Sequence, residues 1–150
     1  MIRIICIGKI KEKFFREAID EYKTRLSKYT KLEIIELPDY NYDIKKTLRE
    51  EHENIMKVYN KNDFNILLDI NGIQLDSLEL SKKISTALIT NSNITFIIGG
   101  SNGVTDELKN MVNMKLSFSQ LTFPHQLFRV VLLEQIYRSF KIINNEEYHK

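Results

Sequence analysis

The stretch Ser117–Phe140, SFSQLTFPHQLFRVVLLEQIYRSF, joins a polar loop directly to a long helix with almost no polar face. Pro124 lies where the first helical turn would begin, a position that tolerates its fixed φ and missing N–H, and Thr122 is close enough to help cap the helix. At ~100° per residue, the apolar side chains that follow are spread around the whole circumference. Such a helix requires burial on all sides. One side can pack on the core of the chain itself. A second copy of the chain is the simplest cover for the other side, so we expect a homodimer.

The few polar residues on this helix lie in two directions. Glu134, Arg138 and Lys141 project within ~60° of each other, and His125 and Arg129, four residues apart, share another direction. Such residues form solvated ion pairs or ion pairs between subunits, or they belong to a site.

Length and composition indicate one soluble globular domain, 1–150, because 43% of the residues are apolar and 28% are charged. The first residues form an apolar run broken by Arg3 and Gly8, too short for a secretory signal or a membrane span, and we expect a cytoplasmic protein. Cys6, the single cysteine, is interpreted as a buried core thiol.

Positive charge is concentrated at the start of the chain although the net charge is only +2. Residues 1–31 hold nine basic side chains against four acidic ones, the basic ones being Arg3, Lys9, Lys11, Lys13, Arg16, Lys23, Arg25, Lys28 and Lys31. This distribution fits a contact zone for a phosphate backbone as well as an ordinary solvated helix face.

Elsewhere, short apolar runs alternate with segments of helical period. We predict strands over 2–7, 32–37, 64–70, 94–98 and 114–118, and helices that begin near Lys13, Ile44, Asp76, Thr105 and Pro124. Asp76 with Glu79 is typical of a capping box. Strands alternating with helices predict an α/β fold, with a largely parallel sheet covered by helices on both faces.

Three loops follow strands of this sheet, at the edge where α/β proteins bind ligands: Asp69–Gly72, Gly99–Gly103 and Phe118–Pro124. The G-G-x-x-G spacing of the second allows close approach of backbone N–H groups to a ligand. It follows the fourth strand and not the first, and no acid follows in 117–123, which disfavours NAD. No Gly-Lys-Ser or Gly-Lys-Thr occurs, and the three histidines lack metal-ligand spacing, so we predict neither a Walker loop nor a metal. Glycines, apolar side chains and hydroxyls suit a neutral nucleoside with a small cationic centre.

Several motifs together resemble the SPOUT-class ribosomal RNA methyltransferases. They are LLDING (67–72), FIIGGSNG (96–103), LSFSQLTFPHQLFRVVLLEQIYRSFKI (116–142) and the closing Glu147-Tyr148-His149. The resemblance covers nearly the full chain. It implies S-adenosylmethionine as cofactor, methylation of N3 of a pseudouridine in 23S rRNA of the assembled ribosome, a homodimer and a C-terminal trefoil knot. General rules of chain connectivity argue against a knot, so the family alone implies it.

The same resemblance assigns residues to roles. It implies cofactor contacts from Leu68, Gly99, Phe118, Ser119, Gln120, Leu121, Thr122 and Phe123. We hypothesise that Arg138 stabilises the developing anionic base, and that Tyr148 and His149 close over it, with His149 as a proton acceptor. The basic N-terminal helix is assigned to rRNA docking. Glu147 stands where many relatives have Pro, and 39–62 is compact beside longer relatives.

Two alternatives stay open. A SPOUT methyltransferase could act on a tRNA or on another rRNA nucleotide. A non-enzymatic, ribosome-binding dimer would use the glycine loop only as a turn and the apolar helix only as an interface.

Overall fold

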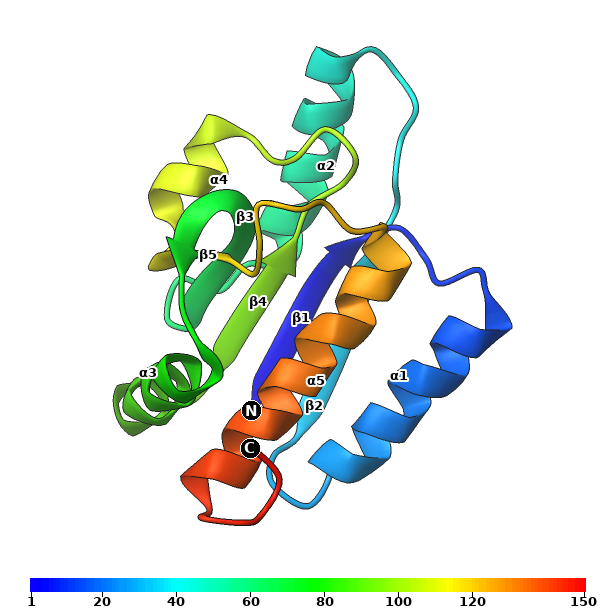
Figure 1. Cartoon of the computed structure of the whole chain (residues 1–150). Helices are drawn as coiled ribbons and strands as arrows, with labels where there is room; N and C mark the ends of the chain where they lie inside the picture. The colour runs from blue at the N-terminus through cyan, green and yellow to red at the C-terminus, as the bar shows by residue number, and fades with distance from the viewer.

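The computed structural model describes all 150 residues and contains one five-stranded parallel sheet with the strand order β2-β1-β4-β3-β5 (Figure 1). The strands are β1 (Ile2–Ile7), β2 (Leu32–Leu37), β3 (Phe64–Gln74), β4 (Ile94–Ile98) and β5 (Met114–Ser117). The helices are α1 (Lys13–Leu26), α2 (Ile44–Val58), α3 (Ser77–Thr90), α4 (Asp106–Met111) and α5 (His125–Ile143). The predicted α/β fold with a parallel sheet is confirmed.

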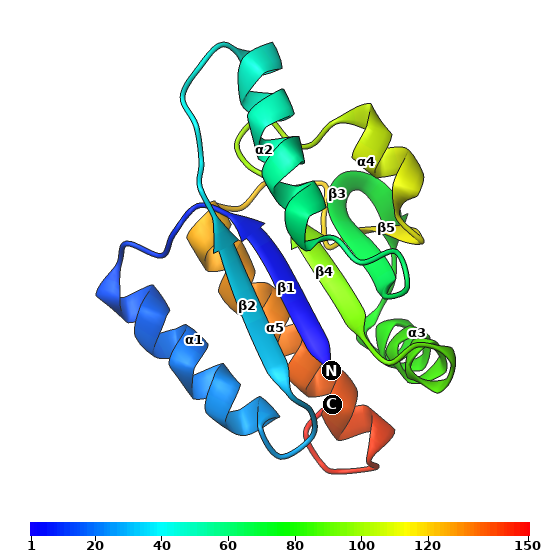
Figure 2. The ribbon, with the colours of Figure 1, turned by 180° about the vertical axis from the view of Figure 1, so that it is seen from behind.

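Helices cover both faces of the sheet, as predicted (Figures 1 and 2). On one face, side chains of α1, α3 and α5 pack against alternate strand residues such as Ile4, Ile66 and Phe96 in a cluster of 19 buried residues. On the other face, Ile55 of α2 and Leu108 of α4 pack against the intervening strand residues in a cluster of 6. The period-2 alternation of strand side chains thus supplies two cores.

Strand β3 is longer than predicted. We expected it to end at Ile70 and to be followed by a loop, but it continues to Gln74, with a register shift against β5 between Leu68 and Ile73. The chain bulges there and returns to β5, and Figure 1 shows the curled ribbon. Gly72 permits this return, because a Cβ on it would lie 2.6 Å from the carbonyl carbon of Lys115.

The start of α5 also differs from the prediction. Pro124 is the residue before the first helical turn, and no side chain caps the helix, so the predicted cap from Thr122 is wrong. The helix lies on the sheet between α1 and α3, and its residues Leu132, Leu133 and Ile136 are fully buried. Much of the circumference is therefore covered within one chain, and the side left for a second copy is narrower than the sequence indicated.

The predicted starts of two helices are confirmed, and side chains cap both of them. Asp76 and Glu79 form the capping box of α3, and the hydroxyl of Thr105 accepts the N–H of Leu108 at the start of α4. Cys6 is fully buried, and burial raises the pKa of its thiol to about 11, which keeps it protonated and unreactive. None of the helices has the length and apolar character needed to cross a membrane.

Candidate active site

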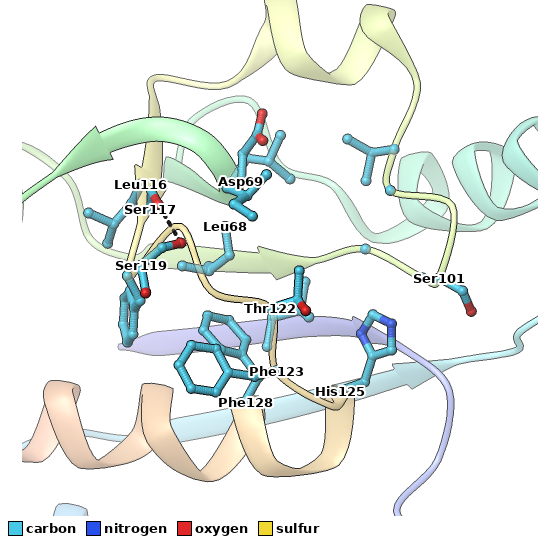
Figure 3. A pocket seen from close by; sticks show the side chains of 18 of the residues that line it. Leu68, Asp69, Ser101, Leu116, Ser117, Ser119, Thr122, Phe123, His125 and Phe128 are labelled. Carbon is cyan, nitrogen blue, oxygen red and sulfur yellow. Dashed lines mark hydrogen bonds between the residues drawn. The ribbon is translucent and has the colours of Figure 1, made fainter.

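The three loops predicted to meet do line one cavity of about 350 Å³ (Figure 3). It lies at the carboxyl ends of β3, β4 and β5, and α5 begins at its rim. Leu68–Ile70 comes from the bulged end of β3, Gly99–Val104 from the loop after β4, and Leu116–Phe123 from β5 and the loop after it. Parallel strands end at one edge of the sheet, which is why segments far apart in sequence converge there.

The structure places most of the predicted cofactor residues at this cavity. Its lining includes Leu68, Gly99, Phe118, Ser119, Leu121, Thr122 and Phe123, but not Gln120. Hydrogen bonds within the loop fix its shape. The hydroxyl of Ser117 donates to the carbonyl of Ser119 (3.1 Å), and the hydroxyl of Ser119 accepts the N–H of Leu121 (3.0 Å).

The glycine loop after β4 has no space for a side chain at Gly99. A Cβ on Gly99 would lie 2.7 Å from a methyl carbon of Val104 and 3.0 Å from the carbonyl oxygen of Gly103. The N–H of Gly103 donates to the carbonyl of Gly100 (3.0 Å), which closes the turn. Backbone atoms of this loop are therefore available to a ligand at close range.

The wall opposite the glycine loop is aromatic. Phe118 contacts Phe128 of α5 edge to face, with ring centroids 5.2 Å apart, and Phe123 stacks on Phe128 at 6.0 Å. The lining holds one carboxylate, Asp69, and one lysine, Lys109. Apolar walls, free backbone groups and hydroxyls, with a single acid, fit an adenosine-like ligand that carries a positive centre.

His125 and Phe128 were not predicted as cavity residues. His125 follows the loop directly and its imidazole faces the cavity in Figure 3. Burial, and then the neighbouring positive charge of Arg129, lower the pKa of His125, so the ring is neutral at neutral pH. The sequence signal was present: the first turn of a helix that follows a binding loop necessarily adjoins the same site.

Arg129 anchors the start of α5 inside the chain. Its guanidinium is 2% exposed, donates to Glu36 of β2 (2.6 Å) and to the carbonyl of Gly8 (3.2 Å), and leaves Nε without a partner. Side-chain Oε1 of Gln126 accepts the N–H groups of Lys11 and Glu12 (2.8 and 3.1 Å). The expected solvated or intersubunit pair at this position is thus a pair within one chain in which the arginine is buried, and together with Gln126 it holds the 8–12 segment against the start of α5.

The residues predicted as catalytic lie together, but outside this cavity. Glu134 of α5 is their common acceptor: it accepts hydrogen bonds from Tyr148 (3.0 Å), from Nε of Arg138 (3.0 Å) and from Tyr22 of α1 (2.6 Å). The guanidinium of Arg138 lies over the Tyr148 ring (4.7 Å) and reaches Nδ1 of His149 (3.2 Å). Burial raises the pKa of both tyrosines, with Glu134 adding to it, so both remain donors. The role of Glu134 as an acceptor for α1 and the tail was not predicted.

Comparison with known proteins identifies the class. Residues 1–149 match the sequence model of the family described as "Predicted SPOUT methyltransferase". This chain belongs to the SPOUT methyltransferase family, as the sequence motifs indicated. No group of three or more His, Cys, Asp or Glu side chains is close enough to hold a metal ion.

Similar proteins carry one recurring name. The chain is 45% identical to "Ribosomal RNA large subunit methyltransferase H" of Caldicellulosiruptor saccharolyticus, over 100% of both chains. It is 50% identical to the protein of that name from Clostridium botulinum (strain 657), over 99% of both chains. Among solved structures it resembles a probable methylase family protein from Haemophilus influenzae, with a TM-score of 0.59, 17% identity, and coverage of 96% of this chain and 66% of the other. At that identity the likeness shows the fold alone.

Proposed function

We propose that this chain transfers a methyl group from S-adenosylmethionine to N3 of a pseudouridine in 23S rRNA of the assembled ribosome. One observation carries the proposal. The cavity at the ends of β3, β4 and β5 is built from the three loops that the resemblance assigns to the cofactor. The chain containing it is similar over its full length to proteins named for ribosomal RNA methylation.

The cofactor would be held by the backbone of Gly99 and Gly100, by the loop Phe118–Phe123 and by Leu68. When bound, S-adenosylmethionine supplies a methyl group already activated by a positively charged sulfur. The main task of the chain's residues is therefore to position the methyl donor and the acceptor and to exclude water, and not to form bonds. Phe118, Phe123 and Phe128 provide the dry wall for this purpose.

The acceptor nitrogen requires a different kind of help. N3 of a uracil-type ring carries a proton at neutral pH, and the N3–H bond must break before or as the N3–CH₃ bond forms. Positive charge and hydrogen-bond donors beside the ring stabilise the resulting anion. We assign this work to the cluster of Arg138, Tyr148 and His149, which Glu134 assembles on α5. The base must leave its stack to reach them.

We further propose that the active species is a homodimer and that the C-terminal part of the chain forms the trefoil knot of the family. Exposed apolar side chains around the loop and the start of α5 support an interface here: Leu121 is 74% exposed, Phe123 37% and Leu127 37%. Ile73 of β3 and Leu78 of α3 are also large exposed apolar residues, at 52% and 50%. We name these five residues the apolar rim. Water contact with so many large apolar groups is unfavourable, and a second copy would remove it.

Calorimetric titration with S-adenosylmethionine, with NAD as negative control, tests the cofactor assignment. Transfer of labelled methyl groups to ribosomes and to purified tRNA tests the acceptor. We expect saturable binding of S-adenosylmethionine alone and labelling of 23S rRNA in intact ribosomes. Labelling of tRNA instead would show that the chain acts on a different substrate. The chain could instead bind ribosomes, bind no S-adenosylmethionine either free or on the ribosome, and label no RNA. That result would support the non-enzymatic dimer.

A further inference from the structure

A buried carboxylate lies directly behind the glycine loop that lines the cavity. Glu51 of α2 is 4% exposed, and its Oε1 has no hydrogen-bond partner. A Cβ on Gly100 would lie 2.8 Å from Oε1 and 3.2 Å from Oε2, so both carboxylate oxygens face the backbone of this residue. Gly100 also lines the cavity at the ends of β3, β4 and β5. The backbone of the glycine loop therefore lies between the carboxylate and a ligand in that cavity.

No positive group of the chain compensates this carboxylate. No lysine, arginine or histidine side chain pairs with Glu51, and its one hydrogen bond comes from the N–H of Tyr40 at 3.4 Å. The nearby carboxylate of Asp39 has the same sign of charge. Burying a carboxylate without a counter-charge destabilises a fold. A positively charged ligand on the other side of Gly100 supplies the missing counter-charge and favours the ionised form.

The other charges near the cavity do not cancel this effect. Asp69 and Lys109, in the lining, are opposite in sign and partly exposed, so water screens both. Arg129 is buried but is paired with Glu36 at 2.6 Å. The charge of Glu51 is neither paired nor screened by water, because protein atoms surround it. It therefore favours a cation in the cavity.

We propose that Glu51 makes the cavity select the methyl donor, whose sulfur is positively charged, over its demethylated product, S-adenosylhomocysteine, whose sulfur is neutral. The inference rests on the proposed function and names a residue that determines specificity for its cofactor. The two ligands have the same adenosine, amino and carboxylate groups, so contacts with those groups cannot distinguish them. A buried negative charge can.

The selection follows from the balance of the reaction. The S–CH₃ bond breaks with its electron pair remaining on sulfur, the methyl group bonds to N3, and the N3 proton passes to solvent. The positive charge that Glu51 favours is thus lost from the cofactor in the transfer step. Affinity for the spent cofactor falls as a result, and a fresh methyl donor can replace it.

The test measures by calorimetry how tightly the wild type and Glu51→Gln bind S-adenosylmethionine, S-adenosylhomocysteine and sinefungin. Sinefungin carries a positively charged amino group in place of the methylated sulfur, so it separates the effect of charge from that of the methyl group. We expect Glu51→Gln to bind the two cationic ligands about 10- to 30-fold more weakly, the effect of one charge at about 8–12 Å with an effective dielectric constant of about 20. Affinity for S-adenosylhomocysteine should stay within about twofold of wild type, because no charge on its sulfur is affected.

Glu53→Gln is the matched control. It removes the same charge from an exposed position of the same helix and should leave all three affinities near wild type. Thermal melts of both variants verify that they are folded.

Equal weakening of all three ligands would show that Glu51 only shapes the loop, and would overturn the assignment. Unchanged affinity for the cationic ligands, or the same loss in Glu53→Gln, would overturn it as well. A wild-type protein that binds none of the three ligands refutes instead the cofactor assignment on which the inference rests.

Discussion

At the scale of single residues, Glu51 is the least favourably placed carboxylate of the chain. Its side chain on α2 is buried (4% exposed), and Oε1 has no hydrogen-bond partner. Its only recorded hydrogen bond is a long one from the N–H of Tyr40 to Oε2 (3.4 Å). A Cβ on Gly100 would lie 2.8 Å from Oε1, so this carboxyl lies directly behind the glycine loop that lines the cavity. Burying an unpaired charge in this way costs stability.

We predict that Glu51→Gln raises the melting temperature at pH 7 by a few degrees. Burial raises the pKa of Glu51, only partly opposed by the N–H of Tyr40, so the folded chain holds this proton more tightly than the unfolded chain does. The contribution of the group to the free energy of unfolding therefore decreases as pH rises through the interval between the two pKa values. Thermal melts from pH 4 to pH 8 should show the gap between variant and wild type closing at the acid end. A gap independent of pH would contradict the ionisation argument.

At the scale of elements, the C-terminal tail is held on α5 by side chains. Tyr148 contacts Tyr137 edge to face (ring centroids 5.1 Å apart) and donates to Glu134. Lys141 pairs with Glu146 at 2.7 Å. None of these contacts involves the cavity at the ends of β3, β4 and β5.

Removal of Tyr148–Lys150 should therefore abolish methylation of ribosomal RNA while leaving S-adenosylmethionine affinity nearly intact. Labelled methyl transfer and calorimetry on the same preparation measure the two quantities. Removal of Lys150 alone is the matched control and should retain activity. Full activity of the longer truncation would refute a role for the tail.

Helix α1 presents its basic residues to solvent. Lys13, Arg16 and Lys23 are exposed, and Lys13 has only a surface pair with Glu17 at 3.6 Å. Such pairs contribute little to stability, so these charges are available for a partner.

Reversing Lys13, Arg16 and Lys23 to Glu should weaken ribosome binding and flatten its dependence on salt, because each phosphate contact releases counterions. Binding measured at several salt concentrations gives the slope. Reversal of Lys61, Lys82 and Lys83, also exposed but away from α1, imposes the same change of net charge as a control. Equal slopes in the two triple variants would place the docking surface elsewhere.

At the scale of the whole molecule, the apolar rim is the surface that a partner subunit would cover. Leu127→Glu places a charge in it, and we expect the mass in solution to fall from that of a dimer to the 17.7 kDa of one chain. Light scattering coupled to gel filtration measures this mass. Ile89→Glu is the control, since Ile89 is 81% exposed but lies at the far end of α3. Loss of the dimer in both variants, or in neither, would contradict the interface.

Most of the fold was predictable because its signals are local. Strand β1, helix α1, strand β2 and the capping box of α3 follow from apolar period and capping residues alone. The continuation of β3 past Ile70 was not predictable, since it depends on how closely Gly72 approaches β5. That the three loops meet was predictable, because the carboxyl ends of parallel strands lie at the same edge of the sheet. The pairing of Tyr22 with Glu134 was not predictable, because it depends on how α1 and α5 lie side by side on the sheet, which no sequence pattern specifies.

Helix α5 also fixes the distance between the cavity and the C-terminal tail. The cavity at the ends of β3, β4 and β5 is at its first turn, and the acceptor that holds the tail, Glu134, is nine residues after His125, about 14 Å along the axis. The separation of the cavity and the tail cluster is therefore set by a count of helical residues and not by a flexible connection. Inserting one residue between Phe128 and Glu134 would lengthen this spacing by only ~1.5 Å but would turn the tail site by ~100° relative to the cavity. The length of this helix thus fixes how the cavity and the tail cluster face each other, without any of its side chains being changed.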